Sequence, residues 1–275
     1  MYDILVNTIN FESWSRDAQY GTQLAALIHA AVTGVYVYPS PLYATPEFGT
    51  PDVIETVVGM SRALEASALG AREAFVAWAK GLGVERAAWV VAQGNLSDAL
   101  AQIACWHDLL VLERDDDRTW STPEDLAGLI LSVGLPCIVV PPRPVGTVSL
   151  ARIAIAWNGS PEAIRAVHSA LPLLQRAEEV LLVRGAPREA FRDIVWKPPF
   201  DVDAYLNRHG VRPHSQDLTT AGHEVGAALL EHARRFDADL LVMGGFGRSR
   251  FREWVLGGVT RHVLWNASLP VLFHH

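Results

Sequence analysis

Short runs of apolar residues alternate along the chain with segments in which apolar residues recur every three or four positions. Runs such as 32–38 and 180–183 are typical of strands that are buried on both faces. The intervening segments predict amphipathic helices, and in one of them Leu96, Leu100 and Ile103 share a face. In each half the order is strand, helix, strand, helix, strand, helix, strand, helix, strand. The pattern predicts an α/β protein with parallel sheets covered by helices.

The two halves of the chain are similar to each other. A unit at 94–112 begins with glycine and runs through a helical pattern into the sequence Asp-Leu-Leu-Val, and a unit at 222–243 does the same. Each half also opens with an apolar strand and closes with one that follows a proline. These strands are at 3–6 and 136–140 in the first half, and at 152–156 and 270–273 in the second. Such internal similarity indicates a repeated domain.

A proline-rich connector at 141–146 separates the two copies. Proline-rich segments are stiff and extended, so they suit a domain boundary. We therefore place the domains at 1–146 and 147–275, each with a doubly wound parallel sheet of five strands. In such sheets ligands bind beyond the carboxyl ends of the strands, where the strand order reverses.

One segment, directly after the predicted strand 240–243, has residues suited to binding an anion. Gly244 and Gly247 allow backbone amides to approach an anion, and Gly257 and Gly258 stand where the last helix begins. Arg248, Arg250 and Arg252 add positive charge. The alternative is a glycine-rich turn followed by a helix with a solvated basic face. The segment lacks the Gly-Lys-Ser/Thr ending of a Walker loop, and it does not follow a first strand as a dinucleotide fingerprint would.

The glycine spacing resembles that of the universal stress proteins. Their nucleotide-binding members carry Gly, two residues, Gly, nine residues, then Gly followed by Ser or Thr, and Gly244, Gly247 and Gly257 fall at that spacing. The opening segment 156–162 and the closing segment 269–272 are also similar to the family. The resemblance covers most of 151–275 and, more weakly, 1–142, so the chain is identified as a tandem member.

The resemblance implies a pseudo-twofold relation between the domains and an ATP or AMP site in the second. It also implies that the final strands, 138–140 and 271–273, pair and so join the halves. The residues that it nominates are Ala156, Trp157, Asn158 and Val183 for the base, Met243, Gly244 and Gly247 for ribose and phosphate, and Gly257, Gly258, Val259 and Thr260 for phosphate.

Three positions depart from what the family's nucleotide binders carry, or leave a role open. Position 258 is glycine, so the hydroxyl donor of a Ser or Thr is missing, and only backbone amides or Thr260 could replace it. Asn158 stands where the binders usually have Asp, so one acceptor is kept and the charge is lost. The ring of Trp157 either stacks on a base or fills the cleft.

The first half has no glycine pattern at the equivalent position. After the strand 109–112 the chain continues with Glu113, Arg114 and three aspartates at 115–117. These carboxylates would repel phosphate, and they lack the spacing of a calcium-binding EF-hand loop. We therefore expect a degenerate first domain with a structural or regulatory role or a different ligand, and no metal.

Composition narrows the class of partner. Among 275 residues, 30 are acidic and 23 basic, and the net charge of −7 gives no general reason to bind nucleic acid or a membrane surface. No apolar run has the length of a membrane helix, and the N-terminus lacks the pattern of a signal peptide. Cys105 and Cys137 lie in apolar surroundings and form no disulfide framework. We expect a cytoplasmic protein.

The function that best fits these observations is a stress-associated binding or regulatory protein with an ATP or AMP site in its second domain. One alternative is a scaffold that binds no nucleotide and acts only through protein partners. Another is a weak ATP hydrolase, although no nucleophile or base can be assembled from local spacing, so we expect no enzyme. Unidentified protein partners and homo-oligomers of the tandem chain both fit. Six tryptophans are expected at exposed positions, and 196–200 is a candidate contact loop; the six are Trp14, Trp106, Trp120, Trp196, Trp254 and Trp265.

Overall fold

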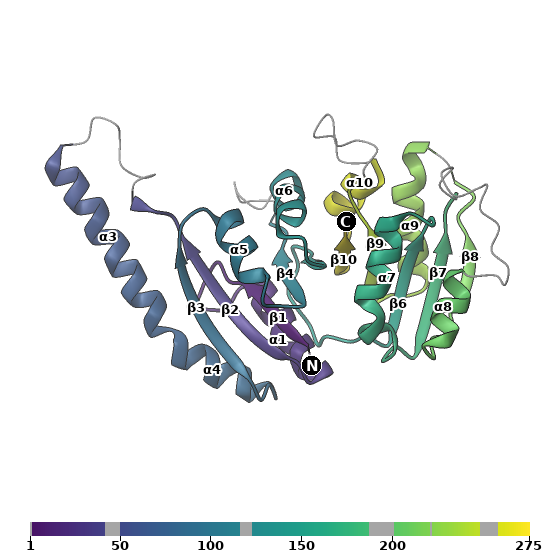
Figure 1. The fold of residues 1–275 in the computed structure, drawn as a ribbon, viewed down its shortest axis with the longest axis horizontal. Coiled ribbons are helices and arrows are strands. Elements are labelled where there is room, and N and C mark those ends of the chain that lie inside the picture. The colour runs from purple at the N-terminus through teal and green to yellow at the C-terminus, as the bar shows by residue number, and fades with distance from the viewer. Residues whose placement is uncertain (1, 42–49, 116–122, 187–200, 221, 248–257) are drawn as a thin grey trace. The chain divides into compact units, whose positions relative to one another are not determined.

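The computed structural model describes residues 2–41, 50–115, 123–186, 201–220, 222–247 and 258–275. Contacts divide the chain into two compact units, Met1–Glu113 and Arg114–His275. Strands and helices alternate along both units (Figure 1), so the predicted α/β class is confirmed.

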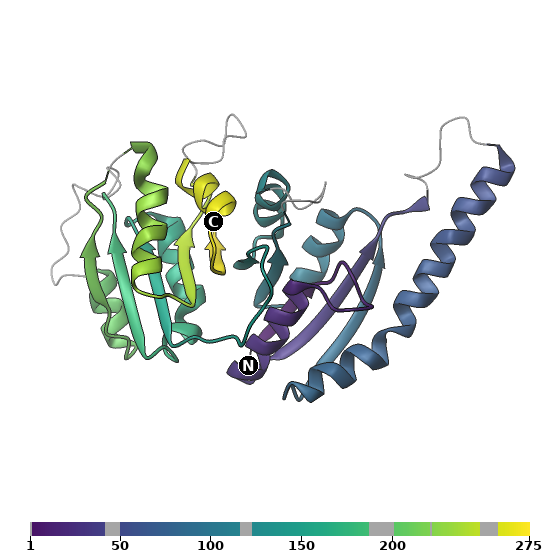
Figure 2. The ribbon, with the colours of Figure 1, turned by 180° about the vertical axis from the view of Figure 1, so that it is seen from behind.

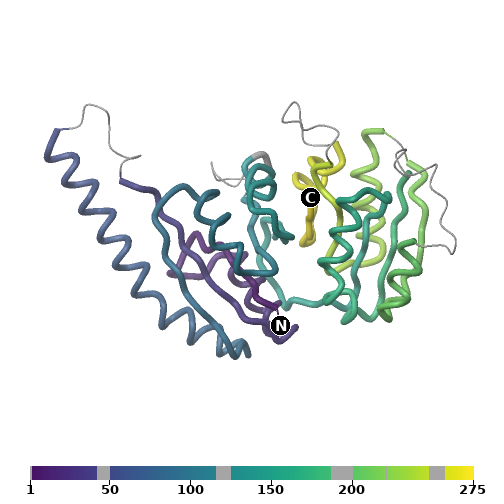
Figure 3. The backbone as a smooth tube through the Cα atoms, in the orientation of Figure 1, coloured from purple at the N-terminus to yellow at the C-terminus, as the bar shows by residue number. Residues whose placement is uncertain are grey.

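The first unit holds a parallel sheet with the strand order β3-β2-β1-β4. Its elements are β1 (Asp3–Asn7), α1 (Arg16–Ile28), β2 (Ala31–Tyr38), α3 (Pro51–Gly70), α4 (Arg72–Gly81), β3 (Ala87–Gln93), α5 (Leu96–Ala104) and β4 (Leu109–Glu113). Between β2 and β3, where one helix was predicted, α3 and α4 follow each other with a short break at Ala71 (Figure 3).

Glycines let two helices of the first unit lie close to the same face of its sheet. A β-carbon on Gly21 of α1 would lie 2.3 Å from Val6 Cγ1, so α1 is seated directly on β1. A β-carbon on Gly34 of β2 would lie within 3 Å of Phe75, which belongs to α4. The helix α5 covers the opposite face (Figures 1 and 2). The sheet is therefore covered on both sides, as a doubly wound fold requires.

The expectation that Trp14 is exposed is wrong. The residue is half-buried instead of exposed, because its ring stacks on Trp78 at 5.3 Å and meets the edges of Phe75 and Trp89. Among the other tryptophans expected at exposed positions, Trp106 is 84% exposed and Trp265 is 42% exposed. The structure does not describe the remaining three, Trp120, Trp196 and Trp254, or the candidate contact loop at 196–200.

The second unit holds a sheet with the order β5-β10-β9-β6-β7-β8, which is parallel except for the pair β5 and β10. Its elements are α6 (Pro123–Val133), β5 (Cys137–Val140), β6 (Arg152–Trp157), α7 (Pro161–Leu174), β7 (Glu179–Arg184), α8 (Val202–Arg208), β8 (His214–Asp217), the short helix η2 (Gly222–Glu224), α9 (Val225–Arg235), β9 (Leu240–Gly244), α10 (Gly258–Asn266) and β10 (Val271–His274). The helices α7 and α8 cover one face, and α9 and α10 cover the other (Figures 1 and 2).

The last strands of the two sequence repeats pair with each other. Ile138 of β5 lies opposite Leu272 of β10, in an antiparallel ladder that confirms the expected junction. This pairing draws α6 and β5 into the second unit, although they belong to the first repeat in sequence. The contacts thus divide the chain after Glu113, whereas the boundary near residue 146 follows the sequence repeat and stays a prediction.

The two cysteines differ in environment. Cys137 is fully buried in β5, and this burial raises the pKa of its thiol. Cys105 was expected in apolar surroundings, but it is exposed, because α5 ends at Ala104 and Cys105 follows as its capping residue. Among the described residues, we find no helix with the length and apolar character needed to span a bilayer.

Candidate functional site

Three strand ends bring predicted residues together at one edge of the second sheet. Ala156 of β6 lies opposite Val183 of β7 on one side and opposite Met243 of β9 on the other. Val183 and Met243 are 1% and 4% exposed, and Ala156 is half-buried. The strand order reverses between β6 and β9, so these residues lie at the switch point where doubly wound sheets bind ligands.

The loop after β6 is a tight turn that starts α7. The side-chain oxygen Oδ1 of Asn158 accepts the N–H of Ser160 at 3.0 Å, and Gly159 has a φ of 72°, which favours glycine. Ser160 Oγ accepts the N–H of Ala163 at 3.2 Å, so Ser160 caps α7 as its sequence predicts. The acceptor of Asn158 that the resemblance assigned to a base is therefore already engaged within the turn.

Trp157 is the last residue of β6 and is half-buried. Its main-chain oxygen accepts the N–H of Gly185 at 2.7 Å, which ties the end of β6 to the residue after β7. Both roles expected for its ring, stacking on a base and filling the cleft, stay predictions.

Packing explains Gly244, the first glycine of the glycine-rich segment. A β-carbon at this position would lie 2.4 Å from the backbone nitrogen of Ala163 and 2.5 Å from the carbonyl carbon of Glu162. Non-bonded atoms do not approach each other that closely. The neighbouring atoms belong to the backbone, which cannot rotate away as a side chain could. Glycine is thus needed at 244 so that the end of β9 can lie against the first turn of α7.

Gly247, the second glycine of the family spacing, lies beside a carboxylate. A β-carbon there would lie 3.6 Å from both Cδ and Oε2 of Glu162. The side chain of Glu162 is buried, and the Nη2 atom of Arg165 lies 3.8 Å from its Oε1. Arg165 in turn donates from Nε to the main-chain oxygen of His275 at 2.7 Å. Sequence reasoning missed Glu162, although its position two residues after a helix cap at the end of a strand could have suggested it.

The helix α10 begins at the edge of the sheet where β9 ends. Its first residue, Gly258, is exposed, and among the described residues no atom lies within 4 Å of the position that a β-carbon would take. Val259 is half-buried, and Thr260 is buried beside Gly245. The first N–H groups of a helix have no partner inside the helix and can bind an anion. Gly257, Arg248, Arg250 and Arg252 lie outside the described residues.

The first unit carries carboxyl groups at the equivalent edge. Glu113 is the last residue of β4, as Gly244 is of β9, and Asp17 is the second residue of α1, as Glu162 is of α7. The Oε2 atom of Glu113 accepts the N–H of Arg16 at 2.9 Å. Glu113 therefore binds the N-terminus of α1. The second unit has Gly244, which lacks a side chain, at the equivalent position.

Asp17 is held in the same cluster. Its Oδ1 accepts the hydroxyl of Ser15 at 2.5 Å and the N–H of Ala18 at 2.8 Å, and the residue is fully buried. Burial, and secondarily the charge of Glu113, raises the pKa of Asp17 well above its usual range. Two buried carboxyl groups therefore lie at the N-terminus of α1. They favour a proton or a hydrogen-bond donor at this edge of the sheet and disfavour phosphate.

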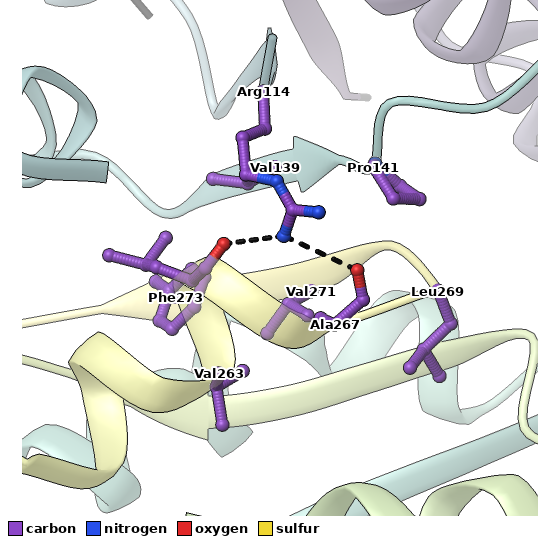
Figure 4. A pocket seen from close by; sticks show the side chains of 9 residues that line it. Arg114, Val139, Pro141, Val263, Ala267, Leu269, Val271 and Phe273 are labelled. Atoms are coloured by element: carbon purple, nitrogen blue, oxygen red, sulfur yellow. Dashed lines mark hydrogen bonds between the residues drawn. The ribbon is translucent and has the colours of Figure 1, made fainter. Parts of the chain in front are cut away.

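Arg114, which sequence reasoning treated as part of an acidic loop, binds the end of α10 (Figure 4). It is 6% exposed, and its Nη1 atom donates to the carbonyl oxygens of Leu264, at 2.5 Å, and Ala267, at 3.3 Å. A cation is favourable beside the free carbonyls at the C-terminus of a helix. The small pocket around the guanidinium is otherwise apolar, and its other lining residues are Val139, Pro141, Val263, Leu269, Val271 and Phe273.

We also searched the described residues for a metal site. Within the residues that the structure describes, no group of three or more His, Cys, Asp or Glu side chains is arranged to hold a metal ion.

The strand order defines the second unit as a doubly wound α/β domain whose order reverses between β6 and β9. Residues 150–275 match the family model of the Universal stress protein family. Residues 150–275 therefore belong to the universal stress protein family. A comparison with curated proteins gave no match.

Solved structures share the fold over nearly the whole chain. A universal stress protein from Archaeoglobus fulgidus DSM 4304 superposes with a TM-score of 0.63 at 12% identity, covering 99% of this chain and 96% of that one. A functionally unknown protein from Pseudomonas aeruginosa PAO1 gives a TM-score of 0.60 at 12% identity, covering 100% of this chain and 92% of that one. At this identity the likeness shows a shared fold.

Proposed function

We propose that the second domain binds an adenine nucleotide, ATP or AMP, at the carboxyl edge between β6 and β9. The observation that carries this proposal is the convergence of three strand ends with the open start of α10 at one edge of the sheet. Ala156, Val183 and Met243 share a register across that edge. Membership of residues 150–275 in the universal stress protein family adds support.

Each part of the site has a role in this proposal. The base lies against the ends of β6 and β7, with Ala156, Trp157, Asn158 and Val183 beside it. The ribose lies against Met243, Gly244 and Gly247, and the phosphate binds the first N–H groups of α10. We assign Gly257, Gly258, Val259 and Thr260 to this contact with the phosphate. The free amides and the dipole of a helix start suit an anion, and no side chain at Gly258 blocks them.

The biological role that follows is a binding or regulatory protein of the cytoplasm that responds to stress through a change of contact surface. In this proposal nucleotide binding changes the surface that a protein partner contacts. The first domain contributes no phosphate site, because Glu113 and Asp17 fill the equivalent edge with carboxyl groups.

A scaffold that binds no nucleotide is the second candidate, and one observation favours it. The buried carboxylate of Glu162 lies against Gly247, where the first proposal puts ribose and phosphate. A fixed negative charge at that point opposes a second one. Hydrolysis of ATP has no residue assigned to it and stays a prediction.

The two candidates differ in whether nucleotide accompanies the purified protein. We would denature the full chain and analyse the released small molecules by mass spectrometry, then record thermal unfolding with millimolar AMP and ATP. Nucleotide binding predicts a released adenine nucleotide or a rise in the unfolding temperature, because a ligand of the folded state stabilises it. A clean extract together with an unchanged unfolding temperature would leave the scaffold.

A further inference from the structure

The strand β3 is the outer edge strand of the first sheet, and its sequence does not protect that edge. It holds neither a charged residue nor a proline, and its seven residues pair with β2 in unbroken register. Among the strands that the structure describes, β3 pairs with β2 alone. An edge strand without charge, proline or bulge is a template on which another strand can pair.

The equivalent edge strand of the second repeat is protected. β8 pairs with β7 as β3 pairs with β2, but it has four residues, His214–Asp217, which are all polar and exposed. Short strands with polar and charged side chains are the usual protection of a free edge. The two repeats thus differ at the same place in the fold, and the difference indicates a partner strand for β3.

The backbone of β3 directs alternate residues toward this edge. Val32 N–H donates to Arg86 O at 3.0 Å, and Gly94 N–H donates to Tyr38 O at 3.0 Å. Residues at even positions therefore bond to β2. Successive residues of a strand direct their N–H and C=O groups to opposite sides. The residues that direct these groups away from β2 are 87, 89, 91 and 93.

We propose that β3 pairs antiparallel with the β3 strand of a second copy of this chain, across a twofold axis at Val90. In this register Trp89 lies opposite Val91 and Ala87 lies opposite Gln93, so the outward residues exchange two hydrogen bonds in each pair. A twofold interface must be complementary to itself. Val90, which is 36% exposed, meets its own copy at the axis.

The charges that flank β3 are compatible with this register. Glu85 and Arg86 precede the strand, and they come opposite Asn95 and Gly94 of the copy. Like charges directly opposite each other would destabilise a pair of strands, and these positions bring none together. The inference concerns the first unit and does not depend on the proposed nucleotide site.

The helix α3 adds apolar surface beside this edge. The indole N–H of Trp89 donates to Ala68 O of α3 at 2.7 Å, and α3 lies at the outer end of the first unit (Figures 1 and 2). Val53, Ile54 and Met60 of this helix are 41%, 43% and 69% exposed. A twofold axis perpendicular to the sheet keeps both α3 helices on one face of the joined sheet. The pairing therefore brings these exposed apolar residues toward the second copy.

Sedimentation velocity of the full chain, from about 1 to 100 μM, tests the pairing. We expect a dimer, with twice the 30.1 kDa mass of one chain. Val90→Lys removes apolar area and places two like charges at the axis, so the dissociation constant should rise about tenfold or more. His214→Lys, on the equivalent strand β8, is the matched control and should leave the dissociation constant unchanged.

A pair of cysteine variants tests the register, and it does so even if Val90→Lys does not fold. Both carry Cys105→Ser, which removes an exposed thiol. Val90→Cys puts two α-carbons about 4.5 Å apart across the axis, within the span of a disulfide. Ala88→Cys, on the same side of the strand, puts them roughly 13 Å apart. Mild oxidation and non-reducing electrophoresis should therefore show a cross-linked dimer for Val90→Cys alone.

The contrary outcomes are equally specific. A wild-type monomer at every concentration would overturn the inference, even if another protein were found to bind β3. A dimer that Val90→Lys and His214→Lys affect equally would place the interface elsewhere. Equal cross-linking of Val90→Cys and Ala88→Cys would contradict the axis at Val90.

Discussion

Two glycines of the same segment are glycine for different reasons. Gly244 has no room for a side chain, because backbone atoms of Glu162 and Ala163 occupy the position of a β-carbon. At Gly258, by contrast, no atom of the residues that the structure describes lies within 4 Å of that position. The spacing of the glycines in sequence suggested a common role in binding an anion, but a pattern of glycines does not distinguish close packing from access for a ligand. Only the positions of neighbouring atoms do.

The first prediction concerns folding. Gly244→Ala should lower the free energy of unfolding by about 1–3 kcal/mol or more, because the added methyl group forces β9 and α7 apart. Gly258→Ala serves as the control and should change it by less than about 1 kcal/mol. Urea titrations followed by circular dichroism measure both values. Equal stabilities for the two variants would show that the close approach at Gly244 is not needed.

The second prediction concerns the hydroxyl that the chain lacks. Gly258→Ser introduces a donor at the first residue of α10, where there is room for it. A hydrogen bond to a charged group is worth about 1.5–3 kcal/mol, so AMP should bind about tenfold more tightly or better. Gly59→Ser, on the exposed surface of α3, should leave the affinity unchanged. Unaltered AMP binding by Gly258→Ser would mean that the phosphate lies elsewhere.

At the scale of elements, the periodicity of apolar residues predicted the order of strands and helices in both repeats, except that α3 and α4 stand where one helix was predicted. It could not predict which side chains meet where a strand ends and a helix starts, since those residues are far apart in sequence. Glu113 and Asp17 form such a meeting at β4 and α1, and Gly244 and Glu162 form another at β9 and α7. The equivalence of the two pairs becomes visible only when the strands are in register.

The third prediction follows from the buried carboxyl pair. The pKa of Asp17 is raised by burial and by Glu113, so the folded chain retains a proton that the unfolded chain releases near the usual Asp value of 3.8. Stability contributed by this proton is present at low pH and is lost as the pH rises above about 4. In Asp17→Asn this loss is absent.

As the pH rises from 4 toward neutrality, the wild type should therefore lose unfolding free energy relative to Asp17→Asn. The slope of this loss should reach up to about 1.4 kcal/mol per pH unit. Chemical denaturation at a series of pH values gives this difference, with Asp52→Asn on exposed α3 as the control. A difference that does not vary with pH would show that Asp17 titrates normally.

At the scale of the whole molecule, the first repeat ends by joining the second. β5 pairs with β10, and Arg114, the residue after β4, binds the carbonyl oxygens at the end of α10. The strand pairing could be expected from the family resemblance. The role of Arg114 could not, because its position within a run of acidic residues indicated a solvated loop, and its partners Leu264 and Ala267 lie about 150 residues away in sequence.

The fourth prediction tests this junction. Arg114→Met keeps the apolar stem but leaves buried carbonyl oxygens at the end of α10 without their donor. Each such loss costs about 1–3 kcal/mol, so the second unit should unfold at a lower denaturant concentration. Arg143→Met, at an exposed position of the connector, is the matched control. If both variants unfold like the wild type, the Arg114 contacts do not stabilise the junction.

The central claim is that the open start of α10 binds the phosphate of an adenine nucleotide, and the most direct test is calorimetric titration of AMP into the wild type and Gly258→Asp. The new carboxylate has room at position 258, so the fold should persist while the anion is repelled. We predict that AMP binds the wild type and Gly59→Asp equally, and that Gly258→Asp weakens it tenfold or more. Equal AMP affinity in all three proteins, or no binding to the wild type, would contradict the claim.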